Sequence, residues 1–326
     1  MDKTRVFSGI QPSGEMHLGN YLGAVKQWVE NQGKEKENFY CIVDLHAHTI
    51  LRDPRELSDN IRSLAAMLFA CGLDSKKSTV FIQSQVRAHA EACWLLNCVT
   101  PMGWLERMTQ FKDKKEKLSS ISAALLDYPV LQTGDIILYD ADEVPVGEDQ
   151  KQHVELARDI AQRFNHLYKQ TFNIPEAIVQ DNKKVIPGLD GRKMSKSYNN
   201  IIPLLSDEKT LKKSIAKIVT NSLEPGDPKD PIGCNVFNLY THFASIEQQS
   251  EFKNDYKEGI SWGDAKNKLF NLINLELMPI RDKYNKLQED KNLVNELLDA
   301  GAAKVRPLAS EMLGELREIV GISKIE

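Results

Sequence analysis

The sequence predicts an α/β fold in which a doubly wound parallel sheet forms the first domain and an all-helical second domain follows. In the first half of the chain, short apolar segments alternate with amphipathic helical segments. From Asp207 onward we find helical patterns and no convincing strand. Alternation of strand and helix at this spacing is typical of a parallel sheet covered by helices on both faces. We expect domains at 1–200 and 201–326, with a last helix that can pack back on the first domain.

The composition is that of an ordinary globular protein. The chain has 326 residues, of which 41% are hydrophobic and 27% charged. No apolar run approaches the roughly 20 residues of a membrane span, and no apolar signal region follows the N-terminal residues. Five scattered cysteines with no Cys-x-x-Cys pair argue against a disulfide framework and a structural zinc site. We therefore expect a cytoplasmic protein without a membrane partner, and any nucleic acid must bind to local patches because the net charge is -4.

The first predicted element is a strand that leads into a phosphate-binding turn. Residues 5–9 form a short apolar strand, and a Gly/Pro-rich turn at 9–14 follows. A helix begins next, because Leu18, Leu22, Val25 and Val29 lie on one face. Exposed N–H groups and the helix dipole favour anions at such a strand–turn–helix junction. Taken alone, His17 in this turn is better explained as a surface histidine whose hydrogen bonds are satisfied.

Three further elements continue the alternation. Residues 38–43 are a buried strand with a polar tip at 44–49. A helix begins at Asp53, which is its N-cap, with Pro54 in the first position. A strand at 79–83 and a helix at 88–99 come next. Because ligands bind at the carboxyl ends of parallel strands, we expect the polar tips to meet in one crevice.

The segment 106–150 contains three features of interest. Residues 112–117 are a charged run, which is either a solvated loop or a contact with phosphates. In the apolar helix 127–139, Asp135 must face solvent or meet a specific donor, because an unpaired buried charge is very costly. Residues 144–150 are a strand-like segment and a glycine turn, and Glu148 and Asp149 open the next helix, which they could simply cap.

A loop with two lysines, Lys193-Met194-Ser195-Lys196-Ser197, follows Gly188 and Gly191. Two cations on a flexible loop can follow charge that develops on a polyphosphate, whereas the alternative is a solvated basic turn. Beyond the loop, helices are predicted around 211–218 and 269–287, and Pro279 is expected to kink the second of them. A further helix ends before Gly301, and a last helix carries Val305 to Val320.

Five motifs in order resemble the bacterial tryptophanyl-tRNA synthetases, a class I aminoacyl-tRNA synthetase family with a Rossmann-like catalytic domain. The resemblance covers essentially the whole chain. It departs from many relatives at Gln132-Thr133-Gly134 and at His48. The motifs are Phe7 to Gly14, His17 to Tyr21, Glu106 to Phe111, Gly147 to His153 and Lys193 to Ser197.

The resemblance implies roles for particular residues. Lys193 and Lys196, assisted by Lys114, would be catalytic, and no protein metal site is implied. ATP would be bound by Gln11, Pro12, Ser13, His17, Gly19, Asn20, Gly147, Glu148, Asp149, Ile186, Lys193, Met194, Ser195, Lys196 and Ser197. Asp135 would accept the indole N–H, and the other tryptophan-binding residues would be Tyr128, Gln150, Phe7, His46, Val144 and Val146.

The implied reaction is activation of L-tryptophan with ATP and substrate-bound Mg²⁺, followed by transfer to tRNA(Trp), in a homodimer whose helical domain reads the anticodon. Three alternatives stay open at this point: a tyrosyl-tRNA synthetase, a nucleotidyltransferase that does not aminoacylate, and a catalytically silent RNA-binding paralogue. The tyrosyl alternative is disfavoured because Gly147 to His153 matches the tryptophan family.

Overall fold

The computed structural model describes residues 3–33, 35–50, 53–117, 121–179 and 186–322, without the side chains of 114, 116 and 117. Its centre is a parallel sheet of five strands in the order β3-β2-β1-β4-β5. The chain therefore winds outward from β1 in both directions, which confirms the predicted doubly wound sheet. The strands are β1 (Thr4–Ile10), β2 (Lys36–Ile42), β3 (Thr79–Ile82), β4 (Glu143–Val146) and β5 (Glu176–Val179).

The strands β1 and β4 pair at one position, Val6 with Glu143, whereas β1 and β2 pair along seven residues. Beyond this pair the carboxyl ends of β1 and β4 are not bonded to each other, so a cavity opens between them. The order of the strands reverses at this point, which is where open α/β sheets bind ligands.

Helices cover both faces of the sheet. Alternate residues of a strand point to opposite faces, so each strand contributes side chains to two hydrophobic cores. Tyr40, Ile42 and Val80 belong to one hydrophobic core, and Phe39, Cys41 and Phe81 to the other. The helices up to β5 are α1 (Leu18–Asn20), α2 (Lys26–Asn31), α3 (Asp44–Ala47), α4 (Pro54–Ala70), α5 (Ala88–Asn97), α6 (Met102–Glu106), α7 (Thr109–Lys117), α8 (Ala123–Ile137) and α9 (Lys151–Leu167).

Several local predictions are confirmed. Asp53 caps α4 by accepting the N–H groups of Arg55 and Glu56, and the helix predicted from Leu18 continues to Asn31. That helix contains one π-helical turn, Tyr21–Val25, and short 3₁₀ turns occur at Gln83–Gln85, Glu148–Gln150 and Lys196–Tyr198. The strand β5 was not predicted from the sequence, since it has four residues of which none is fully buried.

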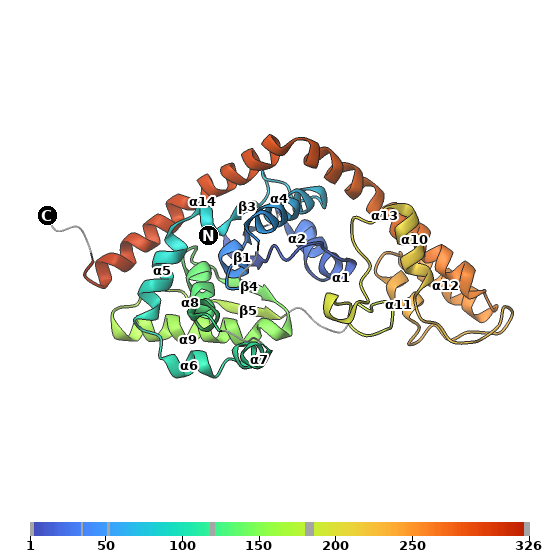
Figure 1. Ribbon diagram of the computed structural model, residues 1–326, viewed down its shortest axis with the longest axis horizontal. Coiled ribbons are helices and arrows are strands. Elements are labelled where there is room, and N and C mark those ends of the chain that lie inside the picture. Colours follow the sequence, from blue (N-terminus) through green and yellow to red (C-terminus); the bar gives the residue numbers. More distant parts are fainter. Residues whose placement is uncertain (1–2, 34, 51–52, 118–120, 180–185, 323–326) are drawn as a thin grey trace.

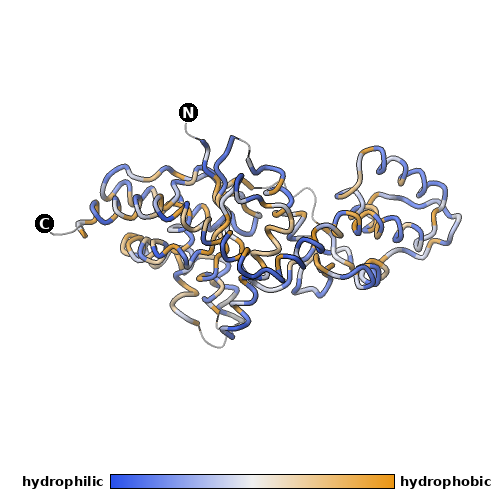
Figure 2. Tube along the Cα trace, turned by 90° about the horizontal axis from the view of Figure 1, so that it is seen from above, coloured by the Kyte–Doolittle hydropathy of each residue, from blue (hydrophilic) through white to orange (hydrophobic). Residues whose placement is uncertain are grey.

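From Asp207 onward the described chain contains helices and no strand, as predicted. Figure 1 shows these helices extending to one side of the sheet, and α14 (red) returning along the top of the sheet-containing part. Seen from above in Figure 2, the molecule is elongated in the same direction. None of the described helices combines the length and apolar character that a membrane span requires. The helices are α10 (Glu208–Ala216), α11 (Asn235–Thr241), α12 (Ile246–Lys257), α13 (Trp262–Glu289) and α14 (Lys291–Ile319).

The expected helix end before Gly301 is wrong, because α14 runs without interruption through Gly301 and Pro307. A Cβ atom at Gly301 would lie 1.9 Å from the carbonyl oxygen of Val80 in β3. Glycine is therefore required here for close packing of a helix on a strand and not for a helix end. The hydrophobic core that contains Leu18 and Leu68 also contains residues of α10 to α14, so the boundary at 200/201 stays a prediction.

Candidate active site

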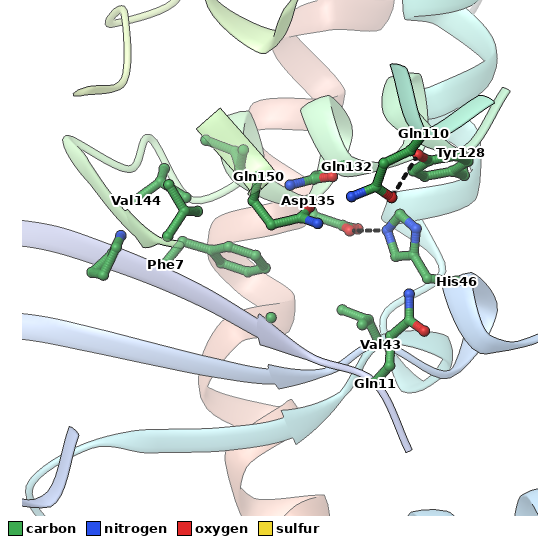
Figure 3. A pocket seen from close by; sticks show the side chains of 14 residues that line it. Phe7, Gln11, Val43, His46, Gln110, Tyr128, Gln132, Asp135, Val144 and Gln150 are labelled. Carbon is green, nitrogen blue, oxygen red and sulfur yellow. Dashed lines mark hydrogen bonds and ion pairs between the residues drawn. The ribbon is translucent and has the colours of Figure 1, made fainter. Parts of the chain in front are cut away.

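A cavity of about 390 Å³ lies between the carboxyl ends of β1 and β4 (Figure 3). Gly9, Gln11, Val43, Gln110, Gln132, Ile136 and Pro145 complete its lining. The other seven lining residues are those that the resemblance assigns to tryptophan, namely Phe7, His46, Tyr128, Asp135, Val144, Val146 and Gln150. They come from five separate elements of the first 150 residues, and the fold brings them together.

Asp135 of α8 is the one buried carboxylate of this cavity, with 1% of its surface exposed. Its Oδ1 accepts hydrogen bonds from Gln83 Nε2 at 2.7 Å and from His89 Nδ1 at 2.6 Å. Its Oδ2 is 2.7 Å from His46 Nε2. Asp135 was expected to meet a specific donor if it is buried, and it contacts three, namely Gln83, His89 and His46. Burial alone would raise the pKa of this carboxyl, but the two histidines more than offset that effect and hold the pKa below its usual value.

Tyr128 lines the same cavity from α8, about two helical turns before Asp135. Its hydroxyl is 2.7 Å from His153 Nε2 of α9, and its ring meets the edge of His46 at a centroid distance of 6.2 Å. Burial raises the pKa of the Tyr128 phenol to about 12. Tyr128 therefore keeps its proton at neutral pH and is a hydrogen-bond donor or acceptor without charge.

The cavity continues into a groove along the turn after β1. Two further cavities, of about 490 and 380 Å³, share Gly9 with the first one, so the three are contiguous. Residues assigned to ATP line this groove, namely Gln11, Ser13, His17, Gly19, Asn20, Gly147, Ile186, Lys193, Met194, Ser195 and Lys196.

The lysine loop and the N-terminal turn meet in this groove, although more than 170 residues separate them in the chain. Lys196 Nζ donates to the carbonyl oxygen of Ser13 at 3.0 Å, and the N–H of Gly19 donates to Met194 Sδ at 3.2 Å. A Cβ atom at Gly19 would lie 3.0 Å from the ring of His17. The structure thus gives a packing reason for glycine at this position, and the expectation that it also leaves room for adenine stays a prediction.

His17 is buried at the start of α1, and burial followed by the nearby charge of Lys196 lowers its pKa to about 4. The imidazole is therefore neutral at pH 7. Its Nδ1 is buried and has no hydrogen-bond partner within the described protein. A neutral imidazole with a buried, unpaired nitrogen in a groove is suited to a polar ligand group.

The base of the lysine loop is fixed by Asn200, which is 2% exposed. Its Oδ1 accepts the N–H of Ser195 at 2.8 Å. Its Nδ2 donates to the carbonyl oxygen of Lys193 at 3.2 Å and to Asp190 Oδ1 at 2.7 Å. One side chain therefore ties together the two ends of the loop that carries both lysines.

Comparison with known proteins identifies this arrangement. The family model of class I tRNA synthetases for tryptophan and tyrosine ("W and Y") matches residues 1–277. The chain belongs to this family.

The similar proteins of this synthetase family are tryptophan–tRNA ligases. That of Neisseria meningitidis is 40% identical over the whole of both chains, and that of Prochlorococcus marinus is 44% identical over 98% of each. A tryptophanyl-tRNA synthetase from Campylobacter jejuni, crystallised with ADP and tryptophan, is 43% identical, with a TM-score of 0.93 over 98% of this chain and 100% of that one. These matches confirm the predicted tryptophan–tRNA ligase activity over the alternatives. A tyrosyl-tRNA synthetase from Archaeoglobus fulgidus, at 20% identity and a TM-score of 0.67, shares the fold.

Some residues that the synthetase family implies do not line the groove. Pro12 is buried behind it, and Glu148, Asp149 and Ser197 are exposed outside the lining of the three cavities. The assigned assistance by Lys114 falls on a side chain outside the described residues.

Of the two departures from the family pattern, Gln132 lines the cavity, whereas His48 is exposed and outside its lining. Sequence reasoning missed His89 as a partner of Asp135. Its position on an apolar helix gives no local signal, because only the packing of α5 on α8 brings the two side chains together.

Proposed function

We propose that this tryptophan–tRNA ligase binds the indole of L-tryptophan in the cavity between β1 and β4, with Asp135 as acceptor of the indole N–H. The observation that carries this proposal is a buried, ionised carboxylate in a cavity that is otherwise lined by apolar and amide side chains, His46 and Tyr128, so that Asp135 is its one carboxylate. Among the described residues Oδ2 has one partner, His46, and so it has acceptor capacity left for a ligand N–H. Phe7, Val144 and Val146 form apolar walls for the rings.

The amino-acid head group then lies toward Tyr128 and Gln150, which line the same cavity. Gln150 also lines the adjoining groove, together with Val146 and Gly9. The carboxylate of tryptophan placed there points to the groove in which we place ATP. This geometry aligns nucleophile and electrophile, which is the main contribution that an enzyme can make when both reactants are already reactive.

We place the nucleotide in the groove with its phosphates at the turn after β1, beside Ser13 and Lys196. The adenine and ribose lie toward Gly147, Ile186 and Met194. Glu15 is the one carboxylate among the described residues that line the phosphate end, so the residues present fit Mg²⁺ that arrives on the ATP phosphates. No group of three or more described His, Cys, Asp or Glu side chains is arranged to hold a metal ion.

The reaction in this proposal is an in-line displacement at phosphorus. A carboxylate oxygen of tryptophan forms a bond to the α-phosphorus of ATP, and the bond from that phosphorus to the bridging oxygen of pyrophosphate breaks. Lys193 and Lys196 stabilise the negative charge that develops on the leaving pyrophosphate. The tryptophanyl group then passes to the 3′-terminal ribose of tRNA(Trp), with AMP as the leaving group. No protein nucleophile is required, which agrees with a groove lined by lysine, glycine and amide groups.

We further propose a symmetric homodimer in the cytoplasm. Trp94 of α5 and Met102 of α6 are 70% and 62% exposed, which is unusual for large apolar side chains. They form an apolar part of the sheet-containing half that a second copy can cover by a two-fold interface. The free, mostly buried cysteines suit a reducing compartment.

The test is ATP–pyrophosphate exchange that depends on an amino acid, with tryptophan and tyrosine measured side by side without tRNA. We expect exchange with tryptophan alone, because a site built around one donor–acceptor pair discriminates strongly. Exchange with tyrosine would overturn the role of Asp135, and exchange with neither would support a silent paralogue.

A further inference from the structure

The proposed reaction does not explain the role of His89, which is a hydrogen-bond partner of Asp135 outside the cavity lining. His89 is fully buried on α5 and is not part of the cavity lining. Its Nδ1 lies 2.6 Å from Asp135 Oδ1, which is the shortest of the three contacts to this carboxylate. An imidazole of this kind acts on a ligand only through the carboxylate.

The far side of His89 is also engaged. Its Nε2 lies 2.7 Å from the hydroxyl of Tyr139, which is completely buried. Burial, and after it the charges of Cys41 and Asp135, raises the pKa of the Tyr139 phenol well above its usual value, so Tyr139 keeps its proton. A phenol that donates to Nε2 leaves the proton of a neutral imidazole on Nδ1, where it points at Asp135.

Both members of this pair are held by packing. The Tyr139 ring stacks on Phe7 at a centroid distance of 5.7 Å and on Phe39 at 5.3 Å. At Gly134 the helix α8 packs on α5, and a methyl group there would be in ordinary van der Waals contact with the carbonyl oxygen of His89, at 3.5 Å. The distance between His89 and Asp135 is therefore set by the contact of two helices and not by a mobile side chain.

The hydrogen-bond donors are distributed unequally over the two oxygens of the Asp135 carboxylate. Gln83 is oriented by the N–H of Leu45, which donates to its Oε1 at 3.1 Å, so that its Nε2 faces Asp135 Oδ1. Oδ1 thus has two donors and Oδ2 has one, His46. Because an ionised carboxylate oxygen accepts about two hydrogen bonds, the free acceptor position belongs to Oδ2.

We infer that His89, supported by Tyr139, is a positioning residue for indole recognition: it saturates Oδ1 of Asp135 and thereby leaves Oδ2 as the acceptor for the indole N–H. The inference rests on the proposed function. It predicts that loss of the Nδ1 donor weakens the selection of the indole N–H more than it weakens activation of amino acids in general.

The experiment uses two substrates that differ at one atom. Tryptophan carries the N–H, and β-(3-benzothienyl)alanine has sulfur in its place. The full chain is assayed by ATP–pyrophosphate exchange with each, and the readout is the ratio of the two kcat/KM values. This ratio does not change when part of the enzyme is unfolded, so a purely structural effect leaves it constant.

Four variants separate the explanations. His89→Leu removes both hydrogen bonds, whereas His89→Asn keeps a donor near the position of Nδ1. Tyr139→Phe removes the support of Nε2. Leu96→Ala shortens a buried side chain of the same helix α5, and leucine has no group that donates a hydrogen bond to the carboxylate.

We expect the tryptophan preference to fall about 10- to 100-fold in His89→Leu, by the cost of a lost partner to a buried charged group. It should fall less in His89→Asn and Tyr139→Phe, and stay constant in Leu96→Ala. An unchanged ratio in His89→Leu, or an equal loss in His89→Asn, overturns the inference. If His89→Leu does not fold, the ratio in Tyr139→Phe decides, and a wild-type ratio there overturns it.

Failure of the proposed function has a different signature. Wild-type enzyme that exchanges with tryptophan but accepts both substrates equally would refute the role of Asp135, and the inference with it, while the ligase activity stands. Absence of exchange with tryptophan would refute the proposed function itself.

Discussion

The substitution Asn200→Ala tests whether the lysine loop must hold the conformation seen here. The side chain of Asn200 is buried and bonds to the backbone of the loop on both sides, to the N–H of Ser195 and to the carbonyl oxygen of Lys193. Alanine removes both bonds, together with the bond from Nδ2 to Asp190 Oδ1, without adding volume. Because the loop is partly exposed, water can hydrogen-bond to the groups that lose their partner. The relevant energy is therefore the net contribution of each hydrogen bond to stability, and not the larger cost of leaving a buried polar group unpaired.

At about 0.5–1.5 kcal/mol for each of the three bonds, the conformation loses about 1.5–4.5 kcal/mol. If Lys193 and Lys196 act only from this conformation, kcat/KM for ATP falls by about 10- to 10³-fold, since 1.4 kcal/mol is a factor of ten. The assay is ATP–pyrophosphate exchange at saturating tryptophan with varied ATP.

Two measurements accompany it. The melting temperature should change little, because the lost bonds lie within a surface loop, and the control Asn238→Ala on the exposed face of α11 should behave as wild type. Exchange within twofold of wild type in Asn200→Ala would refute the reasoning, since the loop would then reach its active conformation without this anchor.

Three further predictions follow from the same structure. Lys196→Ala should lower the exchange rate on the order of 10²-fold or more, by analogy with the loss of an oxyanion donor, and a rate within tenfold of wild type would remove this lysine from the catalytic step. Gly301→Ala should lower the free energy of unfolding by about 1–3 kcal/mol or more, because the added methyl group would overlap the carbonyl oxygen of Val80, whereas Gly314→Ala on the same helix meets no atom and should be neutral or stabilising; urea unfolding of both compares them. The His17 imidazole takes up a proton near pH 6.5 in the unfolded chain but near pH 4 in the folded one, so the unfolded state binds more protons in this window and stability falls as the pH is lowered through it. The urea midpoints of wild type and His17→Gln should therefore converge between pH 6.5 and pH 4, and parallel midpoints would contradict the shifted pKa.

The sequence alone determined those features that depend on neighbouring residues. The cap of α4 at Asp53 was predictable, because a cap is formed by groups three residues apart. The strand, turn and helix that begin the chain were predictable from periodicity and glycine placement, and so was the helical second half. The motifs also indicated which residues would line one cavity, since chemistry restricts residue type and order.

Only the tertiary structure decided which partners each of these residues has. The three donors of Asp135 come from different elements, 46 to 89 residues away along the chain. No local pattern marks His89 as one of them. Gly301 shows the same limit, because a glycine in a helical pattern indicates a helix end by local rules and a close contact with a strand only once the strand is in place. The physical reason is that hydrogen bonding and packing between distant segments depend on distances in space, which the fold sets and the order of residues does not display.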